Sequence, residues 1–263
     1  MLSRLPIVVL LVVLAACSSQ GNAMTEQDAA DQVEVPELGA CRSLTPEDVA
    51  RPFNADEVVD CGEEHTAQTF AVGTFPKELA DHVGVEDPKL GAFIYDTCSE
   101  RFQSFLGGDE SLVMRSTLTW AWFRPTKAAW ENGARWYRCD VVAGSETSKA
   151  LRPLPKTAKG LLLGKPDDTW MSCAAGETVA KADKVPCSER HDWRAVTTIQ
   201  VGREEDPYPG DRLVEVRTRD FCSDSVGAWM NYPVDYDFGY TYFHEAEWKA
   251  GNRRSICWAK TEK

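Results

Sequence analysis

Eight cysteines in two matching groups of four most constrain how this 263-residue chain can fold. The groups consist of Cys41, Cys61, Cys98 and Cys139 and of Cys173, Cys187, Cys222 and Cys257. The third cysteine follows the second after 37 residues in the first group and after 35 residues in the other. Such self-similarity predicts two copies of one small fold rather than a single large domain.

The residues around the cysteines repeat as well, which indicates a tandem duplication. The second cysteine of each group begins a Cys-x3-His segment that ends at His65 or at His191. The fourth cysteine ends a Trp-x2-Gly-x-Arg-x3-Cys segment. Its other members are Trp130, Gly133 and Arg135 in one copy and Trp248, Gly251 and Arg253 in the other. We predict domains at residues 40–143 and 168–263, joined by a solvated linker over residues 144–167.

Hydrophobic periodicity within each copy predicts an α+β fold with one main helix. The residues at helical spacing are Ile94, Cys98, Phe102 and Phe105 within 90–106, and Val214, Thr218, Phe221, Cys222, Ser225 and Trp229. Strand-like runs surround each helix, and the last two strands of each copy are expected to form a hairpin. These runs are residues 69–73, 118–123 and 136–142, and residues 196–202, 240–243 and 255–259. The expected architecture is two tandem, small, disulfide-stapled domains, each with its helix against a short antiparallel sheet.

The N-terminus has the composition of a bacterial lipoprotein signal peptide. Arg4 supplies one positive charge, an apolar run follows to Leu14, and two alanines then precede Cys17. This pattern predicts cleavage after residue 16 and lipidation of Cys17 by palmitate-like acyl chains, which anchor a chain without spanning the membrane. The alternative is an ordinary signal peptide, over residues 1–16, in which Cys17 is incidental. Residues 17–39 carry five acids and no base, and are predicted to form a flexible spacer.

Lipidation would place the chain on the outer face of the cytoplasmic membrane, so that the membrane itself is one partner. The chain has 29 Lys and Arg against 41 Asp and Glu, a net charge of −12. Removal of Arg4 with the signal peptide gives −12 − 1 = −13 for the mature chain. Nucleic acid is therefore not expected as a partner, because its phosphates require clusters of Lys and Arg.

An even number of cysteines in an exported chain favours disulfides. Four cysteines allow three pairings in each copy, and the sequence does not choose among them. We favour sequential pairing, first with second and third with fourth, because the longer loop then staples the helix to the closing strand. The rival hypothesis is a zinc site at the Cys-x3-His segments. Because the chain has four histidines and no Cys-x2-Cys segment, no metal and no other cofactor is expected.

The repeated motif residues are expected to be structural. His65 and His191 are predicted to hydrogen-bond backbone near the disulfide and to order the turn; a ligand or proton-transfer role is the alternative. The two motif arginines are expected to make a bond across the hairpin, to a carbonyl or a carboxylate. The two motif tryptophans are expected to pack beside a disulfide.

A search for catalytic motifs finds none, so we predict no catalytic residue and expect the chain not to be an enzyme. An aromatic run interleaved with acids offers a candidate recognition surface at Tyr232, Tyr236 and Phe238. Three tryptophans without a counterpart tryptophan in the other copy are also candidates for the surface: Trp122, Trp193 and Trp258.

The Cys-x3-His segment before a strand, the cysteine within the helix and the closing tryptophan motif together resemble the septum-formation-related domain. The resemblance covers residues 39–143 and 168–260. Two departures stand out: Phe243 replaces Pro125, and the first two cysteines are farther apart in the first copy. The resemblance implies a lipoprotein of the actinobacterial type with a role near the division septum. It implies no activity and no catalytic residue.

Two functions of different class follow from these patterns. The first is a non-catalytic interaction module at the envelope, which binds an envelope or division protein. The alternative is a module that binds cell-wall glycan through exposed aromatic rings.

Overall fold

The computed structural model describes residues 35–53, 57–144, 148–203 and 205–261. The predicted signal peptide, the predicted lipidation site Cys17 and most of the predicted spacer lie outside these residues. Across the described ranges, no helix is both long enough and apolar enough to cross a membrane.

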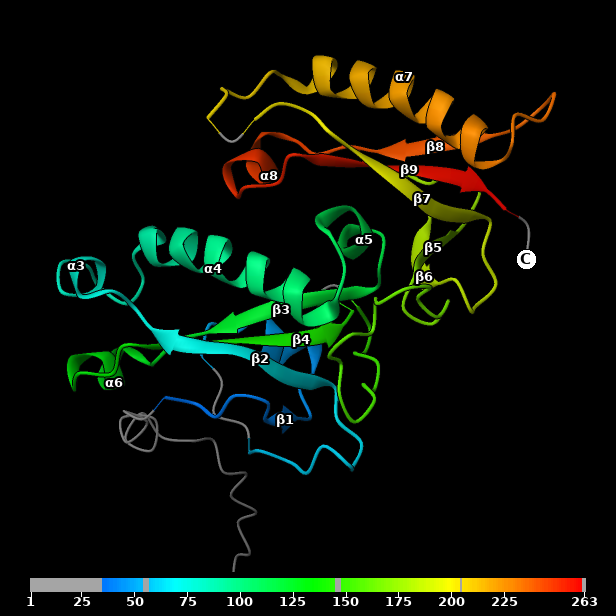
Figure 1. Ribbon diagram of the computed structural model, residues 1–263. Helices are drawn as coiled ribbons and strands as arrows, with labels where there is room; N and C mark the ends of the chain where they lie inside the picture. The colour runs from blue at the N-terminus through cyan, green and yellow to red at the C-terminus, as the bar shows by residue number, and fades with distance from the viewer. Residues whose placement is uncertain (1–34, 54–56, 145–147, 204, 262–263) are drawn as a thin grey trace, which may run out of the picture.

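The first copy folds as a four-stranded antiparallel sheet with a long helix against one face (Figure 1). The strand order is β1-β2-β4-β3. The strands are β1 (Cys41–Arg42), β2 (Ala67–Thr74), β3 (Leu118–Phe123) and β4 (Trp136–Ala143), and the helix is α4 (Pro88–Leu106). Helix α4 buries one apolar stripe, which consists of Leu90, Ile94, Cys98, Phe102 and Leu106. The helix begins after the N-cap Asp87 and ends at Gly107, whose φ of 75° favours glycine.

The second copy repeats this plan with one more strand, in the order β6-β5-β7-β9-β8. The strands are β5 (Ser172–Ala175), β6 (Asp183–Pro186), β7 (Trp193–Gln200), β8 (Phe238–Thr241) and β9 (Arg254–Lys260), and the helix is α7 (Asp211–Trp229). The α+β prediction is thus confirmed. Two of the residues at helical spacing lie outside the buried stripe of α7, because Phe221 and Trp229 are 38% and 50% exposed. Helix α7 packs on its small sheet through a narrower stripe of Val214, Thr218, Cys222 and Val226.

The predicted closing hairpins exist in both copies, as the pairs β3–β4 and β8–β9. Each connection contains a short helix, α6 (Lys127–Glu131) or α8 (Glu245–Lys249), which the sequence analysis did not predict. Thr126 is the N-cap of α6 and favours this helix, because its side chain accepts a hydrogen bond from the backbone N–H of Ala129. Three more short helices lie in the first copy: α2 (Pro46–Val49), α3 (Lys77–Ala80) and α5 (Glu110–Met114).

Four disulfides join the cysteines in sequential order, as favoured from the sequence. They are Cys41–Cys61, Cys98–Cys139, Cys173–Cys187 and Cys222–Cys257. In each copy the third and fourth cysteines tie the main helix to the last strand of the sheet. The other disulfide closes the loop before the first long strand, over 20 residues in one copy and 14 in the other.

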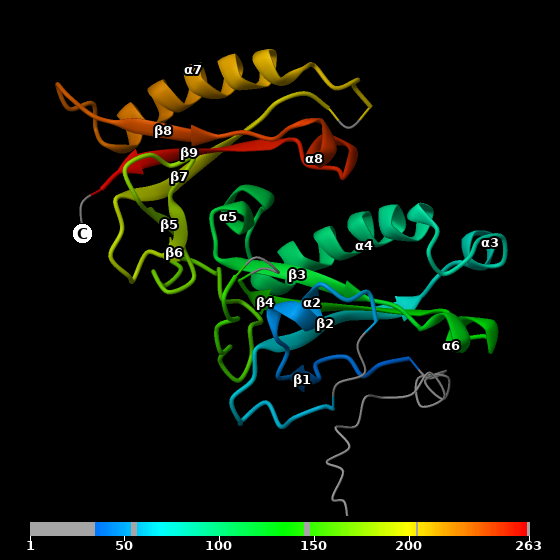
Figure 2. The same cartoon turned by 180° about the vertical axis from the view of Figure 1, so that it is seen from behind.

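The two copies stack in layers, and both views show the same order (Figures 1 and 2). Helix α7 covers one face of the second sheet, and the opposite face of that sheet turns toward α5 and α4 of the first copy. The side-chain contacts that cross this boundary include a bond from the Thr198 hydroxyl to Ser111 at 2.9 Å and an ion pair between Arg254 and Glu110. Main helix α4 therefore lies between its own sheet and the second copy.

The segment between the copies is packed rather than solvated. Three of its five leucines and one alanine are buried against the first copy: Leu151, Leu154, Leu162 and Ala158. Its backbone is also fixed, because the N–H of Leu154 bonds to the carbonyl oxygen of His65 and the N–H of Ala158 to the side chain of Gln68. We conclude that the segment ties the copies together as part of the core.

One group of buried charges distinguishes the first copy from the second. The Nε atom of Arg138 lies 2.9 Å from the carboxylate of Asp140, which also accepts a bond from Thr69 at 2.7 Å. Arg42 donates to the same Thr69 hydroxyl at 2.8 Å, and all four side chains are buried. Burial raises the pKa of Asp140, and the guanidinium of Arg138 opposes that shift. We call these four residues the buried charge cluster.

The second copy fills the corresponding positions with apolar side chains. Strand registers match Asp140 with Trp258, because each is the residue after the last disulfide cysteine of its copy. The same registers place Ala174, Ala195 and Ile256 at the remaining three positions, where they pack in one cluster around Trp258. The duplicated fold therefore tolerates either a polar or an apolar interior at this site.

Candidate functional site

The Trp-x2-Gly-x-Arg motif forms the same compact turn in both copies. Arg135 donates from Nη1 to the carbonyl oxygen of Trp130 at 2.6 Å, and its Cζ lies 4.2 Å from the centre of a ring of that tryptophan. Arg253 makes the same bond to Trp248, with its Cζ 3.7 Å from the ring. The two motif glycines have φ of 99° and 104°, which a residue with a side chain rarely adopts. The motif arginine thus locks its own turn.

The motif tryptophans have different surroundings. Trp130 belongs to the large core cluster that contains the Cys98–Cys139 disulfide. Trp248 packs instead with Val201, Val214 and Phe243, in a cluster separate from the Cys222–Cys257 disulfide. The expectation that both tryptophans lie beside a disulfide therefore does not hold for Trp248.

Both motif histidines bind backbone at the entrance of a long strand. The Nδ1 atom of His65 lies 2.8 Å from the carbonyl oxygen of Glu63, and that of His191 lies 2.7 Å from the carbonyl oxygen of Glu189. Both rings are buried. Among the described residues, no group of three or more His, Cys, Asp or Glu side chains is arranged to hold a metal ion.

The three residues of the candidate recognition surface do not share one exposed face. Tyr232 is 68% exposed, but Tyr236 is half-buried and donates to the carbonyl oxygen of Ser223 at 2.9 Å. The ring of Phe238 lies 6.5 Å from that of Tyr236, within a cluster packed on α7. The exposed part of this region is instead formed by Trp229, Tyr232 and Val234, which we call the α7-end patch.

The prediction for the three unmatched tryptophans was wrong for two of them. Trp193 and Trp258 are buried, because the second copy uses them to fill the space that holds the buried charge cluster in the first. Trp122 is half-buried and lines a groove.

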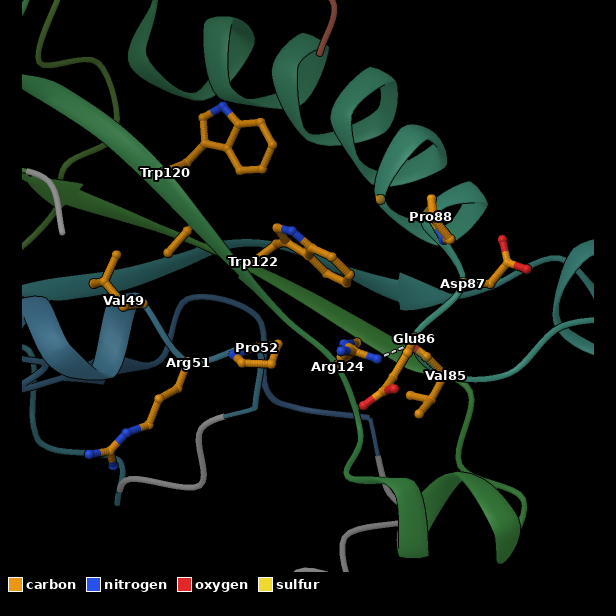
Figure 3. Close-up of a pocket in the computed structure, with 13 residues that line it drawn as sticks. Val49, Arg51, Pro52, Val85, Glu86, Asp87, Pro88, Trp120, Trp122 and Arg124 are labelled. Carbon is orange, nitrogen blue, oxygen red and sulfur yellow. Dashed lines mark hydrogen bonds between the residues drawn. The ribbon is translucent and has the colours of Figure 1, made fainter. Parts of the chain in front are cut away.

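A groove of about 370 Å³ opens beside β3 in the first copy (Figure 3). Three segments line it: residues 49–52 from the end of α2, residues 85–91 at the start of α4, and residues 120–124. Trp120 and Trp122 are two residues apart on β3, so both rings lie on one face of the strand. We call this site the β3 groove.

Arg124 joins the three walls of the β3 groove. Its backbone N–H bonds to the carbonyl oxygen of Pro52 at 2.9 Å, and its Nη1 donates to the carbonyl oxygen of Val85 (Figure 3). Its Cζ lies 6.0 Å from the centre of the Trp122 ring. Burial lowers the pKa of Arg124, and the carboxylate of Glu86 opposes that shift. The Nε atom of Arg124 is buried and has no hydrogen-bond partner within the described ranges.

The second copy contacts Tyr95, a neighbour of the groove residue Trp120. The ring of Tyr95 on α4 lies 6.2 Å from that of Trp120. The ring of Tyr95 also packs so closely on Gly251 that it occupies the space of any Cβ added to this glycine. The motif glycine of the second copy therefore allows a close approach to α4, in addition to the turn that it forms.

The corresponding strand of the second copy carries Phe238, Tyr240 and Tyr242 in place of Trp120, Trp122 and Arg124. The groove wall at residues 49–52 comes from the loop that is longer in the first copy. Sequence reasoning missed this site. Its signals were the longer interval between the first two cysteines and two tryptophans alternating along one strand.

Comparison with known proteins assigns a family. The septum formation family matches residues 11–124 and again residues 116–257, so that the two matches together span nearly the whole chain. No match is found among curated proteins, and none among solved structures. The chain belongs to the septum formation family, to which it matches twice in tandem.

Proposed function

We propose that this protein is a non-catalytic interaction module, held at the outer face of the cytoplasmic membrane by lipid on Cys17, which binds a protein of the envelope or the division machinery. Membership of the septum formation family associates the chain with the septum and the envelope. The lipobox at Cys17 supports the anchor, since a cysteine after Leu-Ala-Ala is the usual site of lipid attachment.

The main support for a protein partner is the exposed α7-end patch. Trp229 and Tyr232 are 50% and 68% exposed, and Val234 is 99% exposed. Large rings that stay exposed on a disulfide-stapled body are typical of the residues that dominate binding energy at protein interfaces. Asp224, Asp235 and Asp237 are exposed beside them. A partner with an apolar pocket and a basic rim would fit this surface.

The backbone of the patch supports the same proposal. Asn231 and Tyr232 have φ of 65° and 50°, which is uncommon outside glycine. The N–H of Tyr232 bonds to the carbonyl oxygen of Gly227 at 2.7 Å and closes the helix end. A Cβ at Gly227 would stand 2.7 Å from the hydroxyl of Tyr236, so glycine is needed for the loop to pack. Conformations of this kind cost energy and cluster at functional sites.

Imaging of the full chain in growing cells tests the proposal. A C-terminal tag that fluoresces outside the cytoplasm is compared in the natural chain, in Cys17→Ala and in the double variant Trp229→Ala/Tyr232→Ala. Leu213→Ala, an exposed apolar residue at the other end of α7, is the matched control.

We expect signal at division sites for the natural chain and for Leu213→Ala. The double variant should remain on the membrane but should no longer be enriched at division sites. Cys17→Ala should no longer be bound to the membrane. Uniform signal from the natural chain would refute the septal role, and unchanged enrichment in the double variant would refute the α7-end patch.

A further inference from the structure

We propose that the β3 groove of the first copy binds a neutral sugar ring. The site is separate from the α7-end patch, and its ligand does not depend on the protein partner proposed above. The groove volume of about 370 Å³ lies within the range of small-molecule sites.

The two tryptophans supply the stacking surface. Pyranose rings present C–H groups on their faces and hydroxyls at their rims, so they pack on flat aromatic rings that have polar groups beside them. Trp120 and Trp122 lie roughly 7 Å apart along β3, which is two residues of an extended strand. Both rings are partly buried against the core cluster of this copy and also line the groove.

The polar groups around the rings have no excess of positive charge. The groove lining carries Arg51 and Arg124 against Glu86 and Asp87. Arg51 already pairs with Glu47 at 2.5 Å, and Figure 3 shows its side chain directed away from Trp122. A site for phosphate or another anion would need a surplus of guanidinium groups. Donors and acceptors that lie side by side suit hydroxyl groups instead.

Arg124 lines this site and has one donor without a partner among the described residues. Its Nη1 is held by the carbonyl oxygen of Val85, so the guanidinium is already oriented before a ligand arrives. Its Nε is buried and has no hydrogen-bond partner within the described ranges. The carboxylate of Glu86, on the exposed rim, can accept from two hydroxyls at once. Stacking on Trp122 and polar contact at the rim thus meet in one place.

The second copy offers a comparison within the same chain. Tyr240 occupies the position of Trp122, and Tyr242 occupies that of Arg124, so the guanidinium is absent there. Tyr240 already contacts Glu215 at 3.3 Å on α7. We therefore place sugar binding in the first copy alone.

Calorimetric titration of the full chain tests this inference. The chain is kept in a detergent without a sugar headgroup, and the probes are maltotetraose and the tetramer of N-acetylglucosamine, at concentrations up to about 10 mM to reach weak affinities. Inorganic phosphate is the charged competitor. Circular dichroism and the melting temperature verify that each variant is folded.

We expect one of the two sugars to bind the natural chain, and Trp122→Ala to weaken binding by about tenfold or more. Glu86→Ala, a change on the exposed rim, is expected to weaken binding by about threefold and serves if Trp122→Ala does not fold. Tyr240→Ala should leave binding unchanged.

Absence of heat with both sugars would overturn the inference. So would unchanged binding in both groove variants, an equal loss in Tyr240→Ala, or competition by phosphate as strong as that by sugar. None of these outcomes bears on the imaging result, because the groove variants leave the α7-end patch intact.

Discussion

The buried charge cluster provides the sharpest test of how the first copy is stabilised. Asp140 is the only carboxylate among its four members, and it faces the guanidiniums of Arg138 and Arg42. Replacement by alanine removes this charge while both guanidiniums stay buried. Taking one partner from a buried ion pair costs about 3–5 kcal/mol, because the remaining charge is left uncompensated in a medium of low polarity.

The second copy suggests the matched control. Since it fills the same four positions with apolar residues, the polar cluster is not required for the fold. The fourfold variant Arg42→Met, Thr69→Val, Arg138→Met and Asp140→Leu removes every charge and keeps the side-chain volumes similar. Such replacements are neutral or stabilise by about 1–4 kcal/mol. We therefore expect the fourfold variant to be at least as stable as the natural chain.

Urea unfolding, followed by tryptophan fluorescence with the disulfides intact, measures both effects. With a slope of about 2 kcal/mol per molar urea, a loss of ~4 kcal/mol lowers the midpoint of the first copy by about 2 M. A midpoint for Asp140→Ala within about 0.5 M of the natural value would refute the reasoning. A fourfold variant as unstable as the single one would show that the hydrogen-bond geometry, and not the unpaired charge, sets the cost.

Three further changes test other parts of the structure. Gly133→Ala should lower the free energy of unfolding by about 1–2 kcal/mol, because the φ of Gly133 is 99° but no atom lies where the new Cβ would stand. Gly251→Ala should cost about 1–3 kcal/mol more, because its φ is 104° and its Cβ would also meet Tyr95. Equal melting temperatures of the two variants would contradict this expectation. Arg135→Met should cost about 1–2 kcal/mol in urea unfolding by removing the bond to the Trp130 carbonyl and the ring contact, and Arg135→Lys should not restore it. Removal of the Cys98–Cys139 disulfide, whose cysteines are 41 residues apart, should lower the free energy of unfolding by about 4 kcal/mol. Removal of the Cys173–Cys187 disulfide, whose cysteines are 14 residues apart, should lower it by about 3 kcal/mol. The reverse order of the two losses would show that loop entropy does not dominate.

The repeated cysteines and their neighbours determined the plan of the molecule. Equal spacing around Cys139 and Cys257 revealed two copies, because a duplicated core needs the same residues at the same separations. Residues at helical spacing from Ile94 to Phe102 located a main helix, since a helix on a sheet must bury one stripe. Sequential pairing of the cysteines was favoured because the longer loop then joins the helix to the closing strand, and the structure confirms it.

The positions of single side chains between elements were decided by tertiary packing. Trp193 and Trp258 became core residues because the second copy lacks the buried charges that occupy that space in the first. Nothing in the order of residues shows that Gly251 must let α8 approach Tyr95, since the two lie in different copies.

For the β3 groove and the α7-end patch as well, the sequence indicated some of the residues and the tertiary structure decided their exposure. The sequence shows that the loop between Cys41 and Cys61 is the longer one. It does not show that this loop folds back beside β3 and forms a wall of the groove next to Trp122. Tyr232 was named from its aromatic surroundings, whereas its neighbour Tyr236 is held on α7 by a bond to Ser223. Spacing along the chain fixes which residues share an element, because helices and strands have fixed periods. Which of them remain exposed depends on what folds against that element from elsewhere in the chain.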